Sequence, residues 1–462
     1  MSRPKDRESI GGELVPTYAA RELAKGVPKH RMAEEGMAPR LAYQVIHDEL
    51  RLDGFSLLNL ATFVTTWMEP EAKQLIDESL DKNMIDKDEY PQTAEIEQRC
   101  VNILANLWHA PEGKPVGTST IGSSEACMLG GMALKWRWRD RQRAAGKPTD
   151  RPNLVMGANT QICWHKFCKY WDVEPREVTA EGDRFTLGAE EAAKLVDENT
   201  IGVVVIMGST MDGSYEPVAD VAKALDAVQK EHGWDIPIHV DGASGAFVAP
   251  FLQPDLEWDF RVPRVQSINT SGHKYGLVYP GVGWVVFRDQ DALPDDLVFH
   301  VTYLGGDMID FSINFSRPGS QVIAQYYNFL RLGLDGYRRI QQASQDVALY
   351  LSSEIGKMAP FRLITKGDDI PVFCWTMDEE YAKSASHSLY DLADKLRERG
   401  WLVPAYPMPR NRQDLVVQRI VVKEDFSHDL AERLLEDLRR AVAYFQSQKG
   451  HVAKQEGSHF HH

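Results

Sequence analysis

Residues 236–245 read IPIHVDGASG, and this stretch decides the fold class. Six strand-like residues end at Asp241, and the small residues Gly242, Ala243 and Gly245 follow closely. Small side chains at such a point let a flat ligand approach the backbone. In open α/β sheets, ligands collect beyond the carboxyl ends of the strands. The stretch therefore predicts a buried strand that delivers an aspartate to a binding site.

Similar strand-like runs occur on both sides of this stretch and alternate with helical sequence. The other runs typical of strands are NLVMG (153–157), IGVVVIMG (201–208), VQSINT (265–270) and GVGWVVFRD (281–289). The runs typical of helices are EEAAKLVDE (190–198) and PVADVAKALDAVQKEHG (217–233). This alternation predicts an α/β fold with a mostly parallel sheet that is covered on both faces.

The pattern divides the chain into three expected parts. Residues 1–57 begin polar and then become helical in LAYQVIHDELRLDG, and residues 58–345 hold the strand–helix alternation. Residues 346–462 combine strand-like runs, IPVFCWTM and DLVVQRIVV, with two amphipathic helical stretches. We expect this last part to be a smaller α+β domain that ends in a mobile tail.

Composition excludes several classes of protein. The 462 residues carry a net charge of -15, which argues against nucleic acid or an anionic membrane as the main partner. Five cysteines without a disulfide spacing indicate a reduced, cytoplasmic protein. The run CWHKFC (163–168) could hold a metal, but buried small side chains are the favoured interpretation, so no metal is expected. No signal peptide or run of about 18 apolar residues is evident, so no integral membrane segment is expected.

A second unusual residue is Lys274, in the stretch SINTSGHKYGLVYPG (267–281). Most lysines are solvated surface charges, but this one follows a strand-like run in a turn of small residues. A lysine and an aspartate at the ends of two strands suit pyridoxal phosphate, which needs an amine for its imine and a carboxylate beside its ring nitrogen. A structural ion pair is the alternative for either residue alone.

A phosphate group would need hydrogen-bond donors, and the sequence offers them before a helical run. Gly122, Ser123 and Ser124 precede the stretch EACMLGGMALKWRWR. The free N–H groups and dipole of a helix N-terminus bind phosphate, and the two hydroxyls add donors. An ordinary helix cap is the alternative interpretation.

Five long motifs resemble one known family. They are TIGSSEACMLGGMALKWRWR (120–139), QICWHKF (161–167), HVDGASGAFVAPF (239–251), SGHKYGLVYPGVGW (271–284) and NFSRPGSQVIAQYYNFLRLG (314–333). In this order they are similar to glutamate decarboxylase of the bacterial and plant type, a fold-type-I pyridoxal phosphate enzyme, over residues 35–446. The resemblance implies a fold-type-I architecture with a seven-stranded sheet and a smaller C-terminal domain.

The resemblance assigns residues to the cofactor ring. It implies that Lys274 carries the internal aldimine and that Asp241 pairs with the pyridinium nitrogen. Ala243 is expected to pack on one ring face and Gln161 to stack over the other. Thr210, in GSTMDGSYE, resembles the residue near the phenolic oxygen.

The resemblance also assigns residues to the phosphate. Ser123, Ser124 and His273 match phosphate ligands, and Ser271 is expected to bind the cofactor as well. Ser316, in NFSRP, matches a contact that the neighbouring subunit gives. A homodimer with shared active sites follows from this match, and the resemblance leaves open whether dimers assemble further into a hexamer.

The resemblance places the substrate between two groups of residues. Thr62 and Phe63 in NLATFVTTW, with Asp86 in NMIDKDEYPQ, match the pocket for the distal carboxylate of glutamate. Asp86 beside a carboxylate is repulsive unless one group is protonated or bridged, which suits an enzyme that works best in acid. Arg419 is expected to bind the α-carboxylate as a bidentate fork; a solvent-facing arginine on an edge strand is the alternative.

The implied activity is decarboxylation of L-glutamate to 4-aminobutyrate and CO₂, with one proton consumed. Tyr303, in VTYLGGDMID, matches a loop residue over the site, and His461 matches a C-terminal histidine that blocks the site at neutral pH. Proton consumption fits a role in acid resistance or in glutamate metabolism. The rivals are decarboxylation of another acidic amino acid, a fold-type-I lyase, a regulatory protein without turnover, and a structural hexamer.

Overall fold

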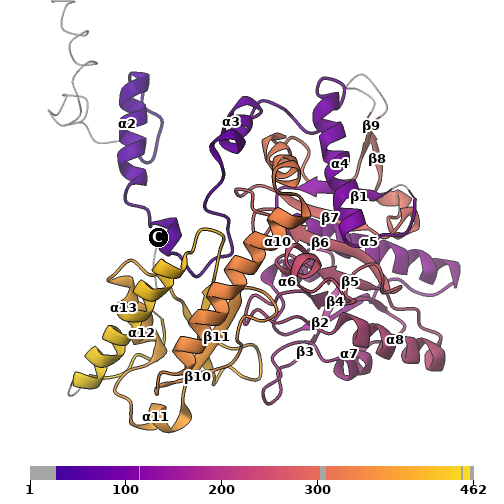
Figure 1. Cartoon of the computed structure of the whole chain (residues 1–462). Helices are drawn as coiled ribbons and strands as arrows, with labels where there is room; N and C mark the ends of the chain where they lie inside the picture. Colours follow the sequence, from indigo (N-terminus) through magenta and orange to yellow (C-terminus); the bar gives the residue numbers. More distant parts are fainter. Residues whose placement is uncertain (1–27, 114, 302–307, 449–450, 458–462) are drawn as a thin grey trace, which may run out of the picture. The chain divides into compact units, whose positions relative to one another are not determined.

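The computed structural model describes residues 28–113, 115–301, 308–448 and 451–457 (Figure 1). The chain divides into two compact units, Met1–Asn59 and Leu60–His462. In the first unit, α2 (Pro39–Leu50) begins at a proline, which is favoured in the first helical turn, and the short 3₁₀ helix η3 (Ser56–Leu58) follows. Among the described residues, no helix is both long enough and apolar enough to cross a membrane.

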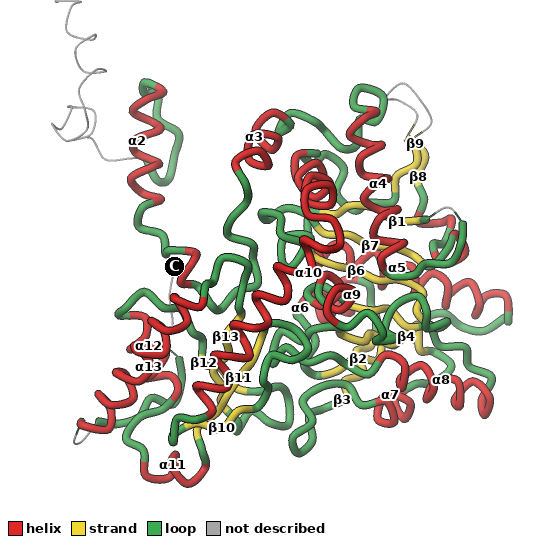
Figure 2. Tube along the Cα trace, viewed as in Figure 1, coloured by secondary structure: helices red, strands yellow, loops and turns green. Residues whose placement is uncertain are grey.

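The second unit is built on a seven-stranded sheet (Figure 2). In spatial order its strands are β1 (Val116–Thr120), β7 (Gly283–Phe287), β6 (Val265–Ser271), β5 (Ile238–Asp241), β4 (Thr200–Ile206), β2 (Asn153–Gly157) and β3 (Glu174–Val178). Strands β2 to β6 run parallel, and β7 is antiparallel to both of its neighbours. The expected mostly parallel sheet is therefore confirmed.

Alternate side chains of the central strands face two different apolar clusters, because successive residues of a strand point to opposite faces. On one face, Leu154 and Met156 of β2 lie in a cluster with Trp138 of α5 (Ser123–Ala144) and Trp164 of α6 (Ile162–Tyr170). On the other face, Val155 of β2 belongs to the largest cluster. That cluster includes apolar residues of α7 (Ala189–Leu195) and α8 (Val218–His232). The sheet is thus covered on both faces.

A second, four-stranded antiparallel sheet lies near the C-terminus. Its order is β10 (Phe361–Leu363), β11 (Val372–Met377), β13 (Val416–Val421) and β12 (Ala405–Pro407). Helices α12 (Leu389–Arg397) and α13 (His428–Ser447) lie beside it (Figure 2). A hydrogen-bonded capping box between Ser388 and Asp391 starts α12.

The remaining elements connect and cover these sheets. They are α3 (Pro70–Glu78), α4 (Pro91–Leu107), α9 (Ala249–Leu252), α10 (Ser320–Gly356), α11 (Glu379–Ser384), the 3₁₀ helices η4 (Gly245–Phe247), η5 (Gln290–Ala292) and η6 (Asp295–Leu297), and the hairpin β8 (Phe299–Val301) and β9 (Met308–Asp310). The expected boundary between residues 345 and 346 falls inside α10, which has a non-helical residue at Gly333.

The sequence patterns did not predict β1 or β3. Strand β1 reads VGTST and β3 reads EPREV, and neither has the apolar run of a central strand. Strand β3 lies at one edge of the sheet, so it needs no continuous apolar sequence. Strand β1 lies at the other edge, where β7 alone pairs with it.

Candidate active site

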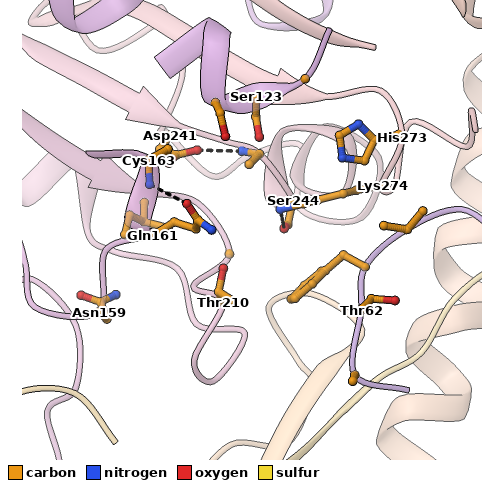
Figure 3. Close-up of a pocket in the computed structure, with 18 of the residues that line it drawn as sticks. Thr62, Ser123, Asn159, Gln161, Cys163, Thr210, Asp241, Ser244, His273 and Lys274 are labelled. Carbon is orange, nitrogen blue, oxygen red and sulfur yellow. Dashed lines mark hydrogen bonds between the residues drawn. The ribbon is translucent and has the colours of Figure 1, made fainter. Parts of the chain in front are cut away.

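A cavity of about 350 Å³ lies beyond the carboxyl ends of β4 and β5, at the N-terminus of α5 (Figure 3). Among the residues that line it are many that the sequence singled out: Thr62, Phe63, Ser123, Ser124, Gln161, Thr210, Asp241, Ala243, His273, Lys274 and Arg419. The residues come from segments that are far apart in the chain, and they belong to one compact unit. The strand-end position that the sequence predicted for Asp241 therefore coincides with a real cavity.

Asp241 is the last residue of β5 and is almost completely buried. Its Oδ2 atom accepts a hydrogen bond from Trp164 Nε1 at 2.8 Å, and its Oδ1 atom accepts bonds from Asn269 Nδ2 and the Ala243 amide at 3.1 Å each. The Cys127 thiol lies 3.7 Å from Oδ2. Four donors thus fix the carboxylate at the floor of the cavity.

Cys127, Cys163 and Asp241 place one ligand-type atom each within 4.8 Å of one another. Burial raises the pKa of the Cys127 thiol well above its usual range, which favours the protonated thiol that donates to Asp241. The two cysteines of CWHKFC, Cys163 and Cys168, are buried in the apolar cluster beside α6. His165 of that run pairs instead with Glu177 at 2.7 Å.

Behind Asp241 lies a chain of hydrogen bonds that the sequence analysis missed. His239 is fully buried, and its ring nitrogens lie 2.7 Å from Ser267 Oγ and 2.7 Å from Asn269 Oδ1. Burial lowers the pKa of His239 to about 4, so the ring is neutral. Since Asn269 donates its amide to Asp241, its oxygen accepts from His239, and Ser267 donates to the other ring nitrogen. The donors of this chain therefore all point toward Asp241.

Lys274 and Asn159 lie on opposite sides of the cavity (Figure 3). Its Nζ atom donates to Ser244 Oγ at 3.3 Å and lies 4.9 Å from the centre of the Phe63 ring. Burial lowers the pKa of Lys274 from its usual range, and the nearby Asp241 charge acts in the opposite direction. A lysine with a lowered pKa is more often a neutral amine, which is the nucleophilic form.

One end of the cavity is formed by the start of α5. Ser123 is the first residue of this 22-residue helix, and Gly122 precedes it. A side chain at Gly283 would place its Cβ 2.5 Å from Gly122 C, so glycine at that position lets β7 approach the turn. His273 closes the same end, with Nδ1 donating to the Val282 carbonyl at 3.0 Å. Burial lowers the pKa of His273, which favours the neutral ring.

Gln161 and Thr210 line the cavity near Ala243. Gln161 caps α6 by accepting the Cys163 amide at 2.7 Å with its side-chain oxygen, and this bond fixes the direction of its side chain. The Thr210 carbonyl accepts a hydrogen bond from Arg419 NH1. The loop after β4 is thereby tied to the C-terminal sheet.

Arg419 lies on β13, which is an interior strand of the four-stranded sheet, and is 6% exposed. The alternative of a solvent-facing arginine on an edge strand is therefore wrong. The guanidinium donates to the carbonyls of Thr210 and Ala61 and lies between the rings of Phe63 and Tyr406, 5.1 and 5.6 Å from their centres. Its buried Nε has no hydrogen-bond partner among the described residues, so donor capacity remains for a ligand.

Thr62 and Phe63 belong to a segment, residues 60–66, that is held from two sides. On one side, Thr65 bonds through its amide and hydroxyl to the carbonyls of His273 and Lys274 at 2.8 Å each. On the other side, the Thr66 amide donates to Glu424 Oε1 at 3.2 Å and its hydroxyl donates to Asp425. The 60–66 segment therefore links the lysine turn to the C-terminal part of the chain.

Glu424 gives a prediction for the pH dependence of stability. Burial raises its pKa from 4.5 to about 7, so the folded protein binds an extra proton between these values. The contribution of Glu424 to stability is then greatest below about pH 4.5 and falls by roughly 1–3 kcal/mol as the pH rises to about 7. Glu424→Gln keeps an acceptor for the Thr66 amide, so its melting temperature is expected to fall less than that of the wild type over this range.

The matched control for this experiment is Glu379→Gln, because Glu379 is exposed at the start of α11. The melting temperatures of the wild type and of both variants are measured from pH 4.5 to 8. The control is expected to follow the wild-type curve. A Glu424→Gln curve that stays parallel to the wild type would contradict the assignment of this proton to Glu424.

Three of the expected site residues do not line the cavity. Asp86 is partly buried, and Ser316 is exposed. Both lie near Asn83: its side-chain amide donates to Ser316 Oγ at 3.4 Å, and its backbone carbonyl accepts from the Asp86 amide at 3.1 Å. Ser271 is fully buried behind the lysine turn, and its hydroxyl has no partner among the described residues. Tyr303 and His461 lie outside the described residues.

The donor set of the cavity fits pyridoxal phosphate. Lys274 supplies the amine, Asp241 supplies a fixed carboxylate, and the start of α5 supplies backbone N–H groups and hydroxyls. The buried hydroxyl of Ser271, three residues before the lysine, is a further donor without a partner. The lysine, the aspartate and the donors at the start of α5 that could hold the cofactor therefore lie in one cavity, with Ser271 buried behind it.

Comparisons with known proteins agree with this geometry. The pyridoxal-dependent decarboxylase conserved domain matches residues 34–377. The glutamate decarboxylase of Aliivibrio fischeri is 56% identical over 94% of this chain and 93% of its own length, and that of Solanum lycopersicum is 48% identical over 94% and 86%. The structure of Lactobacillus brevis glutamate decarboxylase superposes with a TM-score of 0.90 at 48% identity, covering 94% of this chain and 99% of that chain.

A more distant neighbour shows the fold alone. The structure of a sphingosine-1-phosphate lyase from Burkholderia pseudomallei covers 92% of this chain with a TM-score of 0.76 at 22% identity. The resemblance that the sequence motifs indicated is confirmed, as is pyridoxal phosphate as the cofactor. The chain belongs to the pyridoxal-dependent decarboxylase family.

Proposed function

We propose that this chain decarboxylates L-glutamate to 4-aminobutyrate and CO₂ with pyridoxal phosphate and consumes one proton in each turnover. The observation that carries this proposal is the placement of Lys274, Asp241 and Arg419 around a single cavity. The first two suit the cofactor, and the third suits a carboxylate of the substrate. The names of relatives that are 48–56% identical over most of the chain support glutamate as that substrate.

On the cofactor side, each residue has a defined task. When bound, pyridoxal phosphate supplies an electron sink for the pair that remains on the α-carbon as CO₂ leaves. Asp241 keeps the ring nitrogen protonated, and its four donors hold the carboxylate in place. Lys274, whose amine lines the cavity and has a lowered pKa, would hold the cofactor through that amine. Ala243 and Gln161 line the cavity and would hold the cofactor ring from its two faces, and Thr210 would lie near its phenolic oxygen.

At the phosphate end, the proposed ligands are the hydroxyls and amides of Ser123 and Ser124 with His273 and Ser271. The N-terminus of a 22-residue helix favours a dianion through its free N–H groups and its dipole. A neutral His273 whose Nδ1 donates to Val282 carries no proton on Nε2, so that nitrogen can only accept a hydrogen bond, and the ring would donate to a phosphate oxygen only when it is protonated.

On the substrate side, Arg419 would bind the α-carboxylate and so orient the bond that is to be broken. Its contacts with two carbonyls and two aromatic rings fix the guanidinium before substrate arrives. Thr62 and Phe63 contact the rest of the substrate from the 60–66 segment. The pocket for the distal carboxylate would be completed by Asp86 from a second copy of the chain.

We propose that Asp86 and Ser316 reach the active site of a second copy, which makes the functional protein a homodimer with shared sites. Both residues lie away from the cavity of their own chain, and both neighbour Asn83. One patch therefore presents a substrate-binding and a phosphate-binding residue together. Assembly of dimers into a hexamer stays a prediction.

Further proposals complete this function. Tyr303 and His461 lie outside the described residues; the resemblance implies that the first acts at the site and that the second blocks it at neutral pH, so activity is expected to be highest in acid. The five cysteines are free and buried, which supports a reducing compartment and hence the cytoplasm. Residues 58–345 form the cofactor domain and residues 346–462 the small domain. Acid resistance and glutamate metabolism are both consistent with consumption of a proton.

The test is an assay of the purified protein with pyridoxal phosphate and either glutamate or aspartate. CO₂ and 4-aminobutyrate are expected in equal amounts from glutamate, with uptake of one proton in a weakly buffered solution. Aspartate is one methylene shorter, so its kcat/KM is expected to be roughly 10- to 100-fold lower. Equal or faster turnover of aspartate, or no CO₂ release from glutamate, would contradict the proposal.

A further inference from the structure

Ser244 contacts the reactive lysine and has no assigned role in the function above. It follows Asp241 by three residues, lines the same cavity and is 1% exposed. Its Oγ atom accepts a hydrogen bond from Lys274 Nζ at 3.3 Å. Figure 3 shows Ser244 and Lys274 side by side among the residues that line the cavity.

The position of Ser244 makes this contact unusual. Ser244 is the N-cap residue of η4, a place where a serine hydroxyl ordinarily accepts a hydrogen bond from the following backbone. Its side chain makes no such bond here. The hydroxyl is directed to the lysine, inside the cavity.

The backbone on each side of Ser244 is fixed, which fixes the hydroxyl. The Gly242 carbonyl accepts from Thr270 Oγ1 at 3.0 Å, and the Gly245 amide donates to the Met207 carbonyl at 2.8 Å. A Cβ atom on Gly245 would lie 2.5 Å from that carbonyl oxygen, so the turn is as close to β4 as backbone allows. The Cβ atom of Ser244 is therefore held in place, and a single torsion sets the position of Oγ beside a long and flexible side chain.

A second contact bounds the lysine from another direction. The Phe63 ring lies 4.9 Å from Nζ and presents its face to the amine. Ser244 and Phe63 together restrict Nζ to a small region, although a lysine has four rotatable bonds and loses about 2 kcal/mol of conformational entropy when it is fixed.

We propose that Ser244 is a positioning residue for Lys274: its hydroxyl holds the free amine where it can capture the cofactor and return to it after each turnover. This inference rests on the proposed role of Lys274 in the function above. Ser244 forms no bond to substrate and changes no charge. It acts through the direction of one N–H group, which leaves the lone pair of the amine free to face the cofactor carbonyl.

The test uses Ser244→Ala in the full chain, which removes only the hydroxyl. Cofactor is first removed, and the rate of recapture of added pyridoxal phosphate is followed by absorbance; steady-state kinetics of the reloaded enzyme follow. Recapture and kcat are expected to fall roughly tenfold, which is the size of a lost hydrogen bond to a charged or basic group, with KM for glutamate nearly unchanged. Ser244→Thr, which keeps Oγ, is expected to restore both rates.

The matched control is Ser352→Ala, because Ser352 is equally buried and bonds through Oγ to the Lys366 carbonyl at 2.7 Å, away from the cavity. Its recapture rate is expected to equal that of the wild type. An unchanged Ser244→Ala rate, an equal fall in Ser352→Ala, or a failure of Ser244→Thr to recover would each overturn the proposal. Because recapture needs no substrate, it still reads out Ser244 if the protein fails to decarboxylate glutamate.

The pH dependence of the recapture rate distinguishes an effect on the position of the amine from an effect on its ionisation. The charged and titratable groups around Nζ stay the same in the variant: Asp241, Cys127, Cys163, His273 and Arg419. The recapture deficit of Ser244→Ala is therefore expected at every pH from 6 to 9. A deficit that disappears at alkaline pH would show that the hydroxyl acts on the protonation of Lys274 and would overturn the positioning role.

Discussion

Lys274→Ala is expected to abolish CO₂ release from glutamate, by roughly 10⁴-fold or more, while the protein still folds and binds the cofactor weakly. Loss of a group that forms a covalent bond in the reaction has effects of this order. The phosphate donors at the start of α5 and the four donors on Asp241 are untouched by the substitution. The measurement is the release of CO₂ together with equilibrium binding of pyridoxal phosphate.

Borohydride reduction of the wild type identifies the lysine directly, because it fixes the cofactor to its partner amine. Peptide mapping is expected to find the label on Lys274. Lys423 is a useful internal comparison, since it is also buried and its pKa is also lowered by burial, but it does not line the cavity. A label on Lys423, or a Lys274→Ala protein with normal turnover, would refute the assignment.

The inactive variant also tests whether sites are shared. Co-expression of Lys274→Ala with Asp86→Asn creates hybrid dimers with a single working lysine, on the Asp86→Asn chain. If Asp86 acts on the partner's site, that lysine faces an intact Asp86 from the other chain. The hybrid is then expected to show the wild-type ratio of glutamate to aspartate turnover. A ratio equal to that of Asp86→Asn alone would mean that each chain uses its own Asp86.

The sheet and the ends of its strands could be predicted because their sequence signals are local. Apolar runs marked β2, β4, β5, β6 and β7, and the small residues after Asp241 marked the turn. The hydrogen-bond chain behind Asp241 was within reach of the same reasoning. His239 and Asp241 have the same parity on β5, and the parallel register pairs them with Ser267 and Asn269 on β6.

Other parts of the site depend on contacts between segments that no local pattern joins. Thr66 and Glu424 are 358 residues apart, so their contact follows from the fold and not from either sequence. In the sequence, Ser244 is an ordinary small residue of a turn, and only the structure shows that its hydroxyl contacts Lys274. Asp86 and Ser316 were expected beside the substrate and the phosphate, but a single chain does not bring them there.

The second large effect is expected at Arg419. Arg419→Ala is expected to lower kcat/KM for glutamate by roughly 10²- to 10³-fold, because it removes a charge-assisted, bidentate partner of the α-carboxylate. Arg419→Lys keeps the charge but not the planar fork, so it is expected to recover only part of the loss. The carbonyls of Thr210 and Ala61 also lose their donor, so melting temperature and cofactor binding are measured alongside the kinetics.

Inhibition by the product, 4-aminobutyrate, shows whether Arg419 binds the substrate or only supports the structure of the pocket. 4-Aminobutyrate lacks the α-carboxylate, so its inhibition constant is expected to change little in Arg419→Ala while binding of glutamate weakens strongly. Arg412→Ala is the matched control, since Arg412 also bonds to a backbone carbonyl and lies 5.5 Å from the centre of the Phe185 ring, but outside the cavity. Equal weakening of glutamate and 4-aminobutyrate would show that Arg419 supports the pocket walls and does not bind the carboxylate. Weaker binding of glutamate alone would instead show that the buried guanidinium binds the α-carboxylate, which is the group that leaves as CO₂.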